Sequence, residues 1–142
     1  MDPISQGVFG GVFSQVISSK KKIAVASVVG IAAGLSPDLD TFIRSSEDPL
    51  LHLEFHRQFT HSLIFIPLGA LIVTLLLRFF TRKYLSWKET YFYCFLGYAT
   101  HGFLDACTSY GTQLLWPFTD ERISWNNISV VDPLLTIPII FL

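Results

Sequence analysis

Residues 62–77 read SLIFIPLGALIVTLLL, an uncharged run that is followed directly by Arg78. It is the most hydrophobic stretch of the chain, and it predicts a helix that is apolar on every side. About 20 apolar residues are needed to span a bilayer, so a run of this length leaves two alternatives open. It is either a membrane helix or a buried core helix of a soluble α-helical protein.

Four further apolar stretches lie on either side of this one, and none shows the alternation of a strand. The sequence therefore predicts an all-α bundle of about five helices in a single domain, residues 1–142. Asp2 and Pro3 suit a helix start, because Asp caps and Pro is tolerated at the first position. The chain stops within an apolar run, which predicts a truncated last helix. The further stretches are residues 3–19, 23–35, 89–108 and 128–142.

Composition favours the membrane alternative. Charged residues make up 15% of the 142 residues and the mean hydropathy is positive, whereas soluble domains have about 25% charged residues. The basic residues cluster beside apolar stretches, at Lys20–Lys22 and between Arg78 and Lys88, as membrane-flanking charges do. We therefore expect a multi-pass membrane protein, surrounded by lipid. The net charge of -1 gives no reason to expect a nucleic-acid partner, and no oligomeric state is indicated.

Two carboxylates follow the second apolar stretch, in the sequence Pro37-Asp38-Leu39-Asp40. In an extended chain, residues two apart point the same way, so Asp38 and Asp40 could serve one metal ion or a pair. The alternative is a helix-end turn with a capping aspartate.

Two histidines, His56 and His61, precede the most apolar helix. Neutral imidazole is the commonest metal ligand in proteins, although two surface histidines would give the same pattern. Thr60 is placed to act as the N-cap of the following helix, and it is also a candidate additional site residue.

His101 and Asp105 are four residues apart within an apolar helix, so both lie on one helix face. They could bind one ion or form a hydrogen bond in a core. Gly97 and Gly102 in the same helix would allow another backbone to approach closely. Asp132, directly before Pro133, is either a helix cap or an additional ligand.

Together these segments supply three aspartates and three histidines in a chain with few charges. Mixed nitrogen and oxygen ligands favour Zn²⁺, with Mn²⁺ or Fe²⁺ as alternatives, and one or two ions. Placing the basic clusters in the cytoplasm brings every candidate ligand to the non-cytoplasmic face. The predicted ligands are Asp38, Asp40, His56, His61, His101 and Asp105.

The order of these motifs resembles the YdjM-like family of LexA-regulated inner-membrane proteins, which are described as metal-dependent hydrolases. The resemblance covers nearly the whole chain, but the family often has a histidine where this chain has Gln6, and its members are commonly longer. The Gly97…His101…Asp105 piece is also similar to one in zinc-dependent phospholipase C, which implies a distant fold relationship and phosphoester hydrolysis. The matching pieces are Met1-Asp2-Pro3, residues 37–40, His56-Arg57, residues 60–62, residues 97–111, residues 113–118 and residues 131–134.

These observations lead to an expected function: a membrane-bound hydrolase that uses metal-activated water on a phosphoester or lipid-linked substrate. Asp40 would act as the general base, and Arg57 would neutralise charge that develops on the substrate. One alternative is a membrane protein that binds metal without catalysis, such as an ion carrier or a structural subunit. The other is a soluble helical metalloenzyme.

Overall fold

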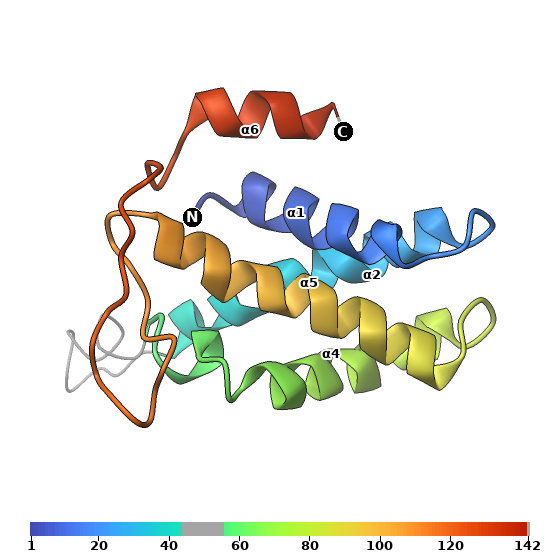
Figure 1. Cartoon of the computed structure of the whole chain (residues 1–142). Helices are drawn as coiled ribbons and strands as arrows, with labels where there is room; N and C mark the ends of the chain where they lie inside the picture. The colour runs from blue at the N-terminus through green and yellow to red at the C-terminus, as the bar shows by residue number, and fades with distance from the viewer. Residues whose placement is uncertain (44–55, 142) are drawn as a thin grey trace.

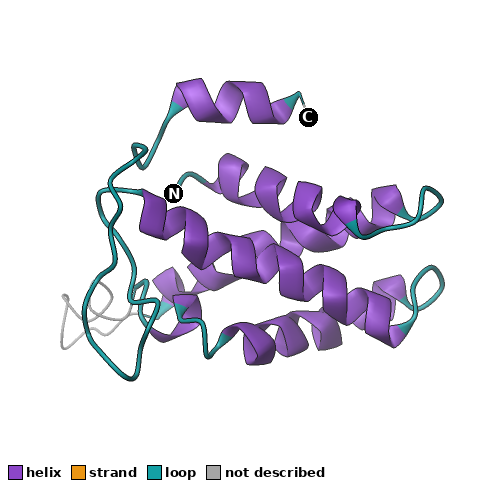
Figure 2. Ribbon diagram, viewed as in Figure 1, coloured by secondary structure: helices purple, strands orange, loops and turns teal. Residues whose placement is uncertain are grey.

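The computed structural model describes residues 1–43 and 56–141. All regular elements in these ranges are helices, and no strand occurs there, so the all-α prediction is confirmed (Figure 2). The expected number of about five is also confirmed for the α-helices. The elements are α1 (Pro3–Val16), α2 (Ile23–Leu35), α4 (Ile66–Thr81), α5 (Trp87–Cys107) and α6 (Pro133–Ile140), with the short 3₁₀ helices η1 (Ser36–Phe42) and η2 (Phe59–His61).

The α-helices form two antiparallel hairpins, α1–α2 and α4–α5, with α5 in contact with α1, α2 and α4 (Figure 1). Helix α6 lies along α1, where Ser5 and Thr136 share a hydrogen bond of 2.8 Å. The two short hairpin turns lie at one end of the bundle. The N-terminus, η1, η2 and the long segment after α5 lie at the other end.

Local signals fix most of the helix starts. Asp2 caps α1 by accepting from the Ser5 backbone N–H at 2.9 Å, as predicted. Ser86 and Glu89 form a capping box that starts α5 slightly earlier than expected. The N-cap prediction for Thr60 was wrong. Residues 62–65 form turns, so α4 starts only at Ile66, and Thr60 lies in η2.

The prediction of an extended backbone at Asp38 and Asp40 was also wrong. Helix α2 ends at Leu35 as expected, but the chain continues as the 3₁₀ helix η1. Pro37 has a φ angle suited to the first turn of a helix, so it starts η1 and does not stop the helical path. With about three residues per turn, Asp38 and Asp40 point in different directions.

Helices α1, α2 and α5 pack through small residues. A Cβ atom on Gly10 would lie 2.4 Å from the Gly30 carbonyl oxygen, and one on Gly97 would lie 2.5 Å from the same oxygen. Only glycine permits backbones to approach this closely, as in many membrane helix pairs. This packing brings the end of α2, and therefore η1, against the part of α5 that carries His101.

Apolar side chains also cover much of the surface. On α4, Leu68, Leu75, Leu76, Phe79 and Phe80 are all more than half exposed. Apolar patches of this kind mark contacts with a membrane or with another protein. One stretch, Ile23–Phe42, which joins α2 and η1, is long and apolar enough to cross a bilayer, whereas α4 is apolar but shorter.

Candidate metal centre

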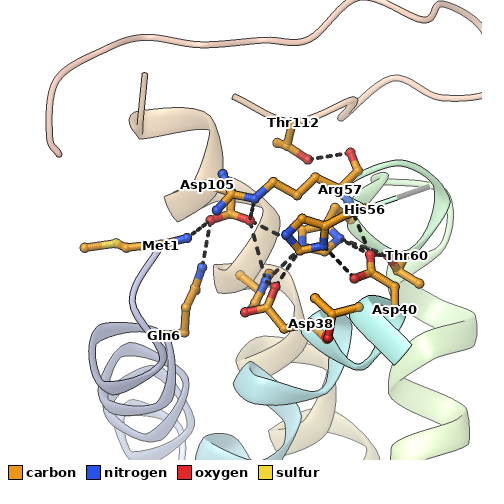
Figure 3. A network of polar contacts seen from close by, with 12 residues as sticks. Met1, Gln6, Asp38, Asp40, His56, Arg57, Thr60, Asp105 and Thr112 are labelled. Carbon is orange, nitrogen blue, oxygen red and sulfur yellow. Dashed lines mark hydrogen bonds and ion pairs between the residues drawn. The ribbon is translucent and has the colours of Figure 1, made fainter. Parts of the chain in front are cut away.

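All six predicted ligands come together at one end of the bundle (Figure 3). They form two sets with Asp38 in common, and in each set one ligand atom per residue lies within 4.8 Å of the others. Asp132 belongs to neither set, because it caps α6 by accepting from the Leu134 N–H at 3.1 Å. The first set is Asp38, His61, His101 and Asp105, and the second is Asp38, Asp40 and His56.

Three segments position these side chains. Helix α5 presents His101 and Asp105 one turn apart, η1 presents the other aspartates, and residues 56–61 cross over α5. A Cβ on Gly102 would lie 2.6 Å from the His61 carbonyl oxygen, so glycine is required for this crossing. The close approach expected at Gly102 is therefore confirmed, and it places the His61 and His101 rings 4.6 Å apart.

The hydrogen-bond partner of His101 shows which of its ring nitrogens carries the hydrogen. Its Nδ1 lies 2.5 Å from the carbonyl oxygen of Gly34, which can only accept a hydrogen bond. Nδ1 therefore carries the hydrogen, and in the neutral ring Nε2 presents a lone pair. Such a hydrogen bond to a backbone carbonyl is typical of a metal-binding histidine.

The partners of His61 lead to the same assignment. Thr60 Oγ1 donates to Asp40 Oδ2 at 2.6 Å, so it is free to accept from His61 Nδ1 at 2.9 Å. His61 Nε2 then also presents a lone pair. The two Nε2 atoms face each other at 2.9 Å, a repulsive arrangement unless a proton or a cation lies between them.

Four atoms of the first set have the spacing of a tetrahedral site. Of the six pairs among the two Nε2 atoms, Asp38 Oδ1 and Asp105 Oδ2, the five that include a nitrogen are separated by 2.9, 3.2, 3.3, 3.5 and 3.6 Å. A tetrahedral zinc ion with bonds of about 2.0–2.2 Å has ligand atoms about 3.3–3.6 Å apart. The set therefore matches one ion with two nitrogen and two oxygen ligands.

The two carboxylate oxygens of Asp105 differ in their hydrogen-bond partners. Its Oδ1 accepts from Gln6 Nε2 at 3.1 Å and contacts the Met1 amino group, while Oδ2 is buried without a hydrogen-bond partner among the described residues. Arg57 Nε lies 3.2 Å from Oδ2 as an ion pair. A buried carboxylate oxygen of this kind is costly unless it is paired or binds a metal ion.

The electrostatic field of the site favours a cation. Burial alone would lower the pKa of His61, but the nearby carboxylates of Asp105, Asp38 and Asp40 outweigh burial and raise the pKa to about 10. Three carboxylates around one buried imidazole therefore stabilise positive charge at its ring. A divalent ion at the same place would benefit from the same field.

The second set is the more open side of the site. Asp40 is buried and accepts three hydrogen bonds, from His56 Nδ1 at 2.7 Å, from Thr60 at 2.6 Å and from the Arg57 N–H at 3.2 Å. The His56 side chain is 19% exposed and that of Asp38 is 28% exposed. Water can therefore reach the cluster from this side, through His56 and Asp38.

Arg57 is held in an unusual backbone conformation. Its φ of 64° is left-handed, which costs a non-glycine residue about 1–3 kcal/mol. Its carbonyl oxygen accepts from the Gln113 N–H at 3.1 Å and from Thr112 at 3.2 Å, and its guanidinium lies over the Tyr110 ring. The loop after α5 therefore holds Arg57 against Asp105.

Sequence reasoning missed several residues that support the cluster. Tyr98 donates to the Thr60 carbonyl oxygen at 2.8 Å, and Arg57 contacts Thr108 at 3.4 Å. Gln6 was noted only as a departure from a family histidine, yet its side chain reaches Asp105. The signal available in the sequence was a long polar side chain, Gln6, within an uncharged stretch of small and apolar residues.

Comparison with known proteins identifies the family. The model of the family described as "YdjM inner membrane protein" matches residues 1–142. The chain belongs to this family. The resemblance seen in the sequence is thereby confirmed, and the chain is a membrane protein of the YdjM family with a buried Asp/His cluster that could hold a metal ion.

Two curated relatives share this similarity. The chain is 27% identical over 123 residues to the uncharacterized protein YfhP of Bacillus subtilis (strain 168), covering 86% of this chain and 37% of the relative. It is 33% identical over 107 residues to the inner membrane protein YbcI of Escherichia coli (strain K12), covering 71% of this chain and 60% of the relative. The chain thus spans less than two thirds of either relative. No solved structure matches it, so the phospholipase C-like relationship stays a prediction.

Proposed function

We propose that this protein is a multi-pass membrane hydrolase that holds one or two divalent ions, Zn²⁺ first, in the Asp/His cluster. One observation carries the proposal. The Nε2 atoms of His61 and His101 face each other at 2.9 Å beside a buried oxygen of Asp105 that has no hydrogen-bond partner among the described residues, so a positive charge is needed between them. A proton on His61 supplies that charge without metal, and a divalent ion would take the place of the proton and bind both nitrogens and the oxygen.

A divalent ion bound here would supply a nucleophile by lowering the pKa of its water to about 7. The other set provides the residues that move the proton. We assign Asp40 as the base in partnership with His56, because Asp40 Oδ1 contacts His56 Nδ1 and, of these two side chains, His56 is the one that is exposed to water. Arg57 balances the charge of Asp105 beside the reacting centre and would neutralise charge on a phosphoryl oxygen.

The arrangement of the bundle supports a site on the non-cytoplasmic face. The turns that carry Lys20–Lys22 and Arg82–Lys83 lie at the end opposite the cluster (Figure 1). Basic residues in short loops favour the cytoplasm, so the cluster would face the other side of the inner membrane. A phosphoester or lipid-linked substrate suits that position.

Hydrolysis of phosphoesters by the detergent-purified protein tests the proposed function. The assay would compare zinc-loaded and chelator-treated protein on p-nitrophenyl phosphate, bis-p-nitrophenyl phosphate and phosphatidic acid. We expect zinc-dependent release of product, and a loss of about 10²–10⁴-fold in Asp40→Asn if that residue acts as the base. The matched control is Asp120→Asn, at an exposed carboxylate outside the cluster. Zinc binding without hydrolysis of any of these esters would indicate the non-catalytic alternative.

A further inference from the structure

An apolar groove of about 350 Å³ runs from the cluster along the outside of the bundle. It lies between η1 with the end of α2 on one side and α4 on the other. Asp40 and Thr60 line it where it meets the cluster, and the rest of its lining is almost entirely apolar. The apolar walls include Leu39, Ile43, Phe65, Ile72 and Leu76.

The end of the groove near the cluster is shaped by a glycine and a tyrosine. A Cβ on Gly69 would lie 2.3 Å from the Tyr98 ring, so glycine lets α4 pack directly on this ring. The Tyr98 hydroxyl donates to the Thr60 carbonyl oxygen at 2.8 Å. Tyr98 therefore connects the groove to the segment that carries Thr60 and His61.

The walls of the groove face the surroundings of the protein. Leu39 is 59% exposed, Ile72 is 45% exposed and Leu76 is 68% exposed. From Gly69 to Leu77 the groove follows α4 for about 12 Å, at 1.5 Å per residue. In a protein of an inner-membrane family, such a groove is open to the hydrocarbon of the bilayer.

We propose that the groove holds one hydrocarbon chain of a membrane lipid that carries a phosphoester headgroup. The chain would lie along α4 against Ile72 and Leu76, and the headgroup would reach the cluster beside Asp40. The apolar body of the groove suits a hydrocarbon chain, whereas its Asp40 end is negatively charged and would accept an anionic phosphate only through a divalent ion held in the cluster.

This proposal deepens the proposed function and rests on it for the fate of the headgroup. Hydrolysis would consume one water molecule. The water oxygen would bond to phosphorus, the phosphorus–oxygen bond to the rest of the lipid would break, and the leaving oxygen would take a proton from the water. Binding of the chain in the groove does not depend on that reaction.

Photo-crosslinking in vesicles of phosphatidylethanolamine and phosphatidylglycerol tests the groove. The probes are phosphatidic acid and diacylglycerol with the same chains, each with a diazirine near the chain end, and mass spectrometry locates the labelled residues. We expect phosphatidic acid to label the groove walls selectively. Leu76→Trp should lower that labelling by about tenfold, the effect of excluding about two methylene groups.

Leu75→Trp is the matched control, because Leu75 is a neighbouring exposed leucine of α4 that does not line the groove. Equal labelling around Leu75 and Leu76, or no labelling of the groove, would overturn the proposal. Equal labelling by diacylglycerol would overturn the headgroup assignment.

Zinc content and hydrolysis measured on the same samples separate the two proposals. Labelling of the groove walls without bound zinc or hydrolysis would overturn the hydrolase and the headgroup assignment and leave the site for the chain, whereas zinc-dependent hydrolysis with uniform labelling would overturn the groove alone.

Discussion

At the scale of single residues, the hydrogen-bond partners of two histidines define the candidate metal centre. Gly34 and Thr60 fix a hydrogen on Nδ1 of His101 and His61, respectively, so both Nε2 atoms point into the cluster as candidate ligands. The supporting contacts are therefore as informative as the ligands themselves, and they can be tested separately.

Loss of a proposed ligand should remove bound metal. We expect Asp105→Asn and His101→Ala each to weaken zinc binding by more than the 10–100-fold typical of a supporting residue. Isothermal titration of detergent-purified protein measures this, and circular dichroism checks that the helices remain. Asp132→Asn is the control, because that carboxylate only caps α6. Unchanged zinc affinity in both cluster variants would show that His101 and Asp105 interact only with each other in the core and do not bind zinc.

Thr60 should influence metal binding without contacting the ion. Thr60→Val removes the hydroxyl that joins Asp40 to His61, so the His61 ring loses the partner that fixes its tautomer. We expect zinc affinity to fall by about 10–100-fold. Thr74→Val is the matched control, since the buried Thr74 hydroxyl donates to the Ala70 carbonyl oxygen within α4 at 2.7 Å and has no recorded contact with the cluster residues. A fall of equal size in both variants would show that the effect is general destabilisation.

At the scale of elements, one glycine decides how closely residues 56–61 approach α5. In Gly102→Ala the new methyl would meet the His61 backbone at 2.6 Å, so His61 should shift away from His101 and zinc affinity should fall. Gly7→Ala should leave zinc binding unchanged, because its methyl meets only side chains at 3.4 Å or more, and alanine favours the helix by about 1 kcal/mol. Titration with zinc and thermal unfolding in detergent measure the two effects. Full zinc affinity in Gly102→Ala would contradict the argument.

The sequence predicted the elements whose signals are local. The spacing of His101 and Asp105 follows from helix periodicity, and the boundaries of α2 follow from its apolar run. The 3₁₀ helix at Pro37 and the late start of α4 escaped prediction, because proline and short turns allow several backbone paths. The contacts of Gln6 and Tyr98 with the cluster join segments far apart in sequence, so only the packing of α1 and α5 reveals them.

At the scale of the whole molecule, the bundle has a basic end and a cluster end. Lys22 and Glu89 form an ion pair of 2.6 Å that joins the two hairpin turns at the basic end. Residues 44–55, between η1 and η2, lie outside the described residues, so cysteine reporters of membrane orientation are better placed elsewhere.

Cysteine labelling with a membrane-impermeant reagent should reveal the orientation. In a background with Cys94 and Cys107 replaced by serine, Ser109→Cys at the cluster end should label in intact cells. Lys83→Cys at the basic end should label only after the cells are opened. Both positions are exposed, whereas Thr81, within the same basic stretch, is buried and would report poorly. The reverse pattern would place the cluster in the cytoplasm.

The central claim is that the Asp/His cluster binds a divalent metal ion. Its most direct test is the zinc content of the detergent-purified protein, measured by inductively coupled plasma mass spectrometry after dialysis against limiting zinc. We predict one or two zinc ions per chain in the native protein, and none retained in the double variant His61→Ala/His101→Ala. A native protein that retains no more zinc than the double variant would contradict the claim.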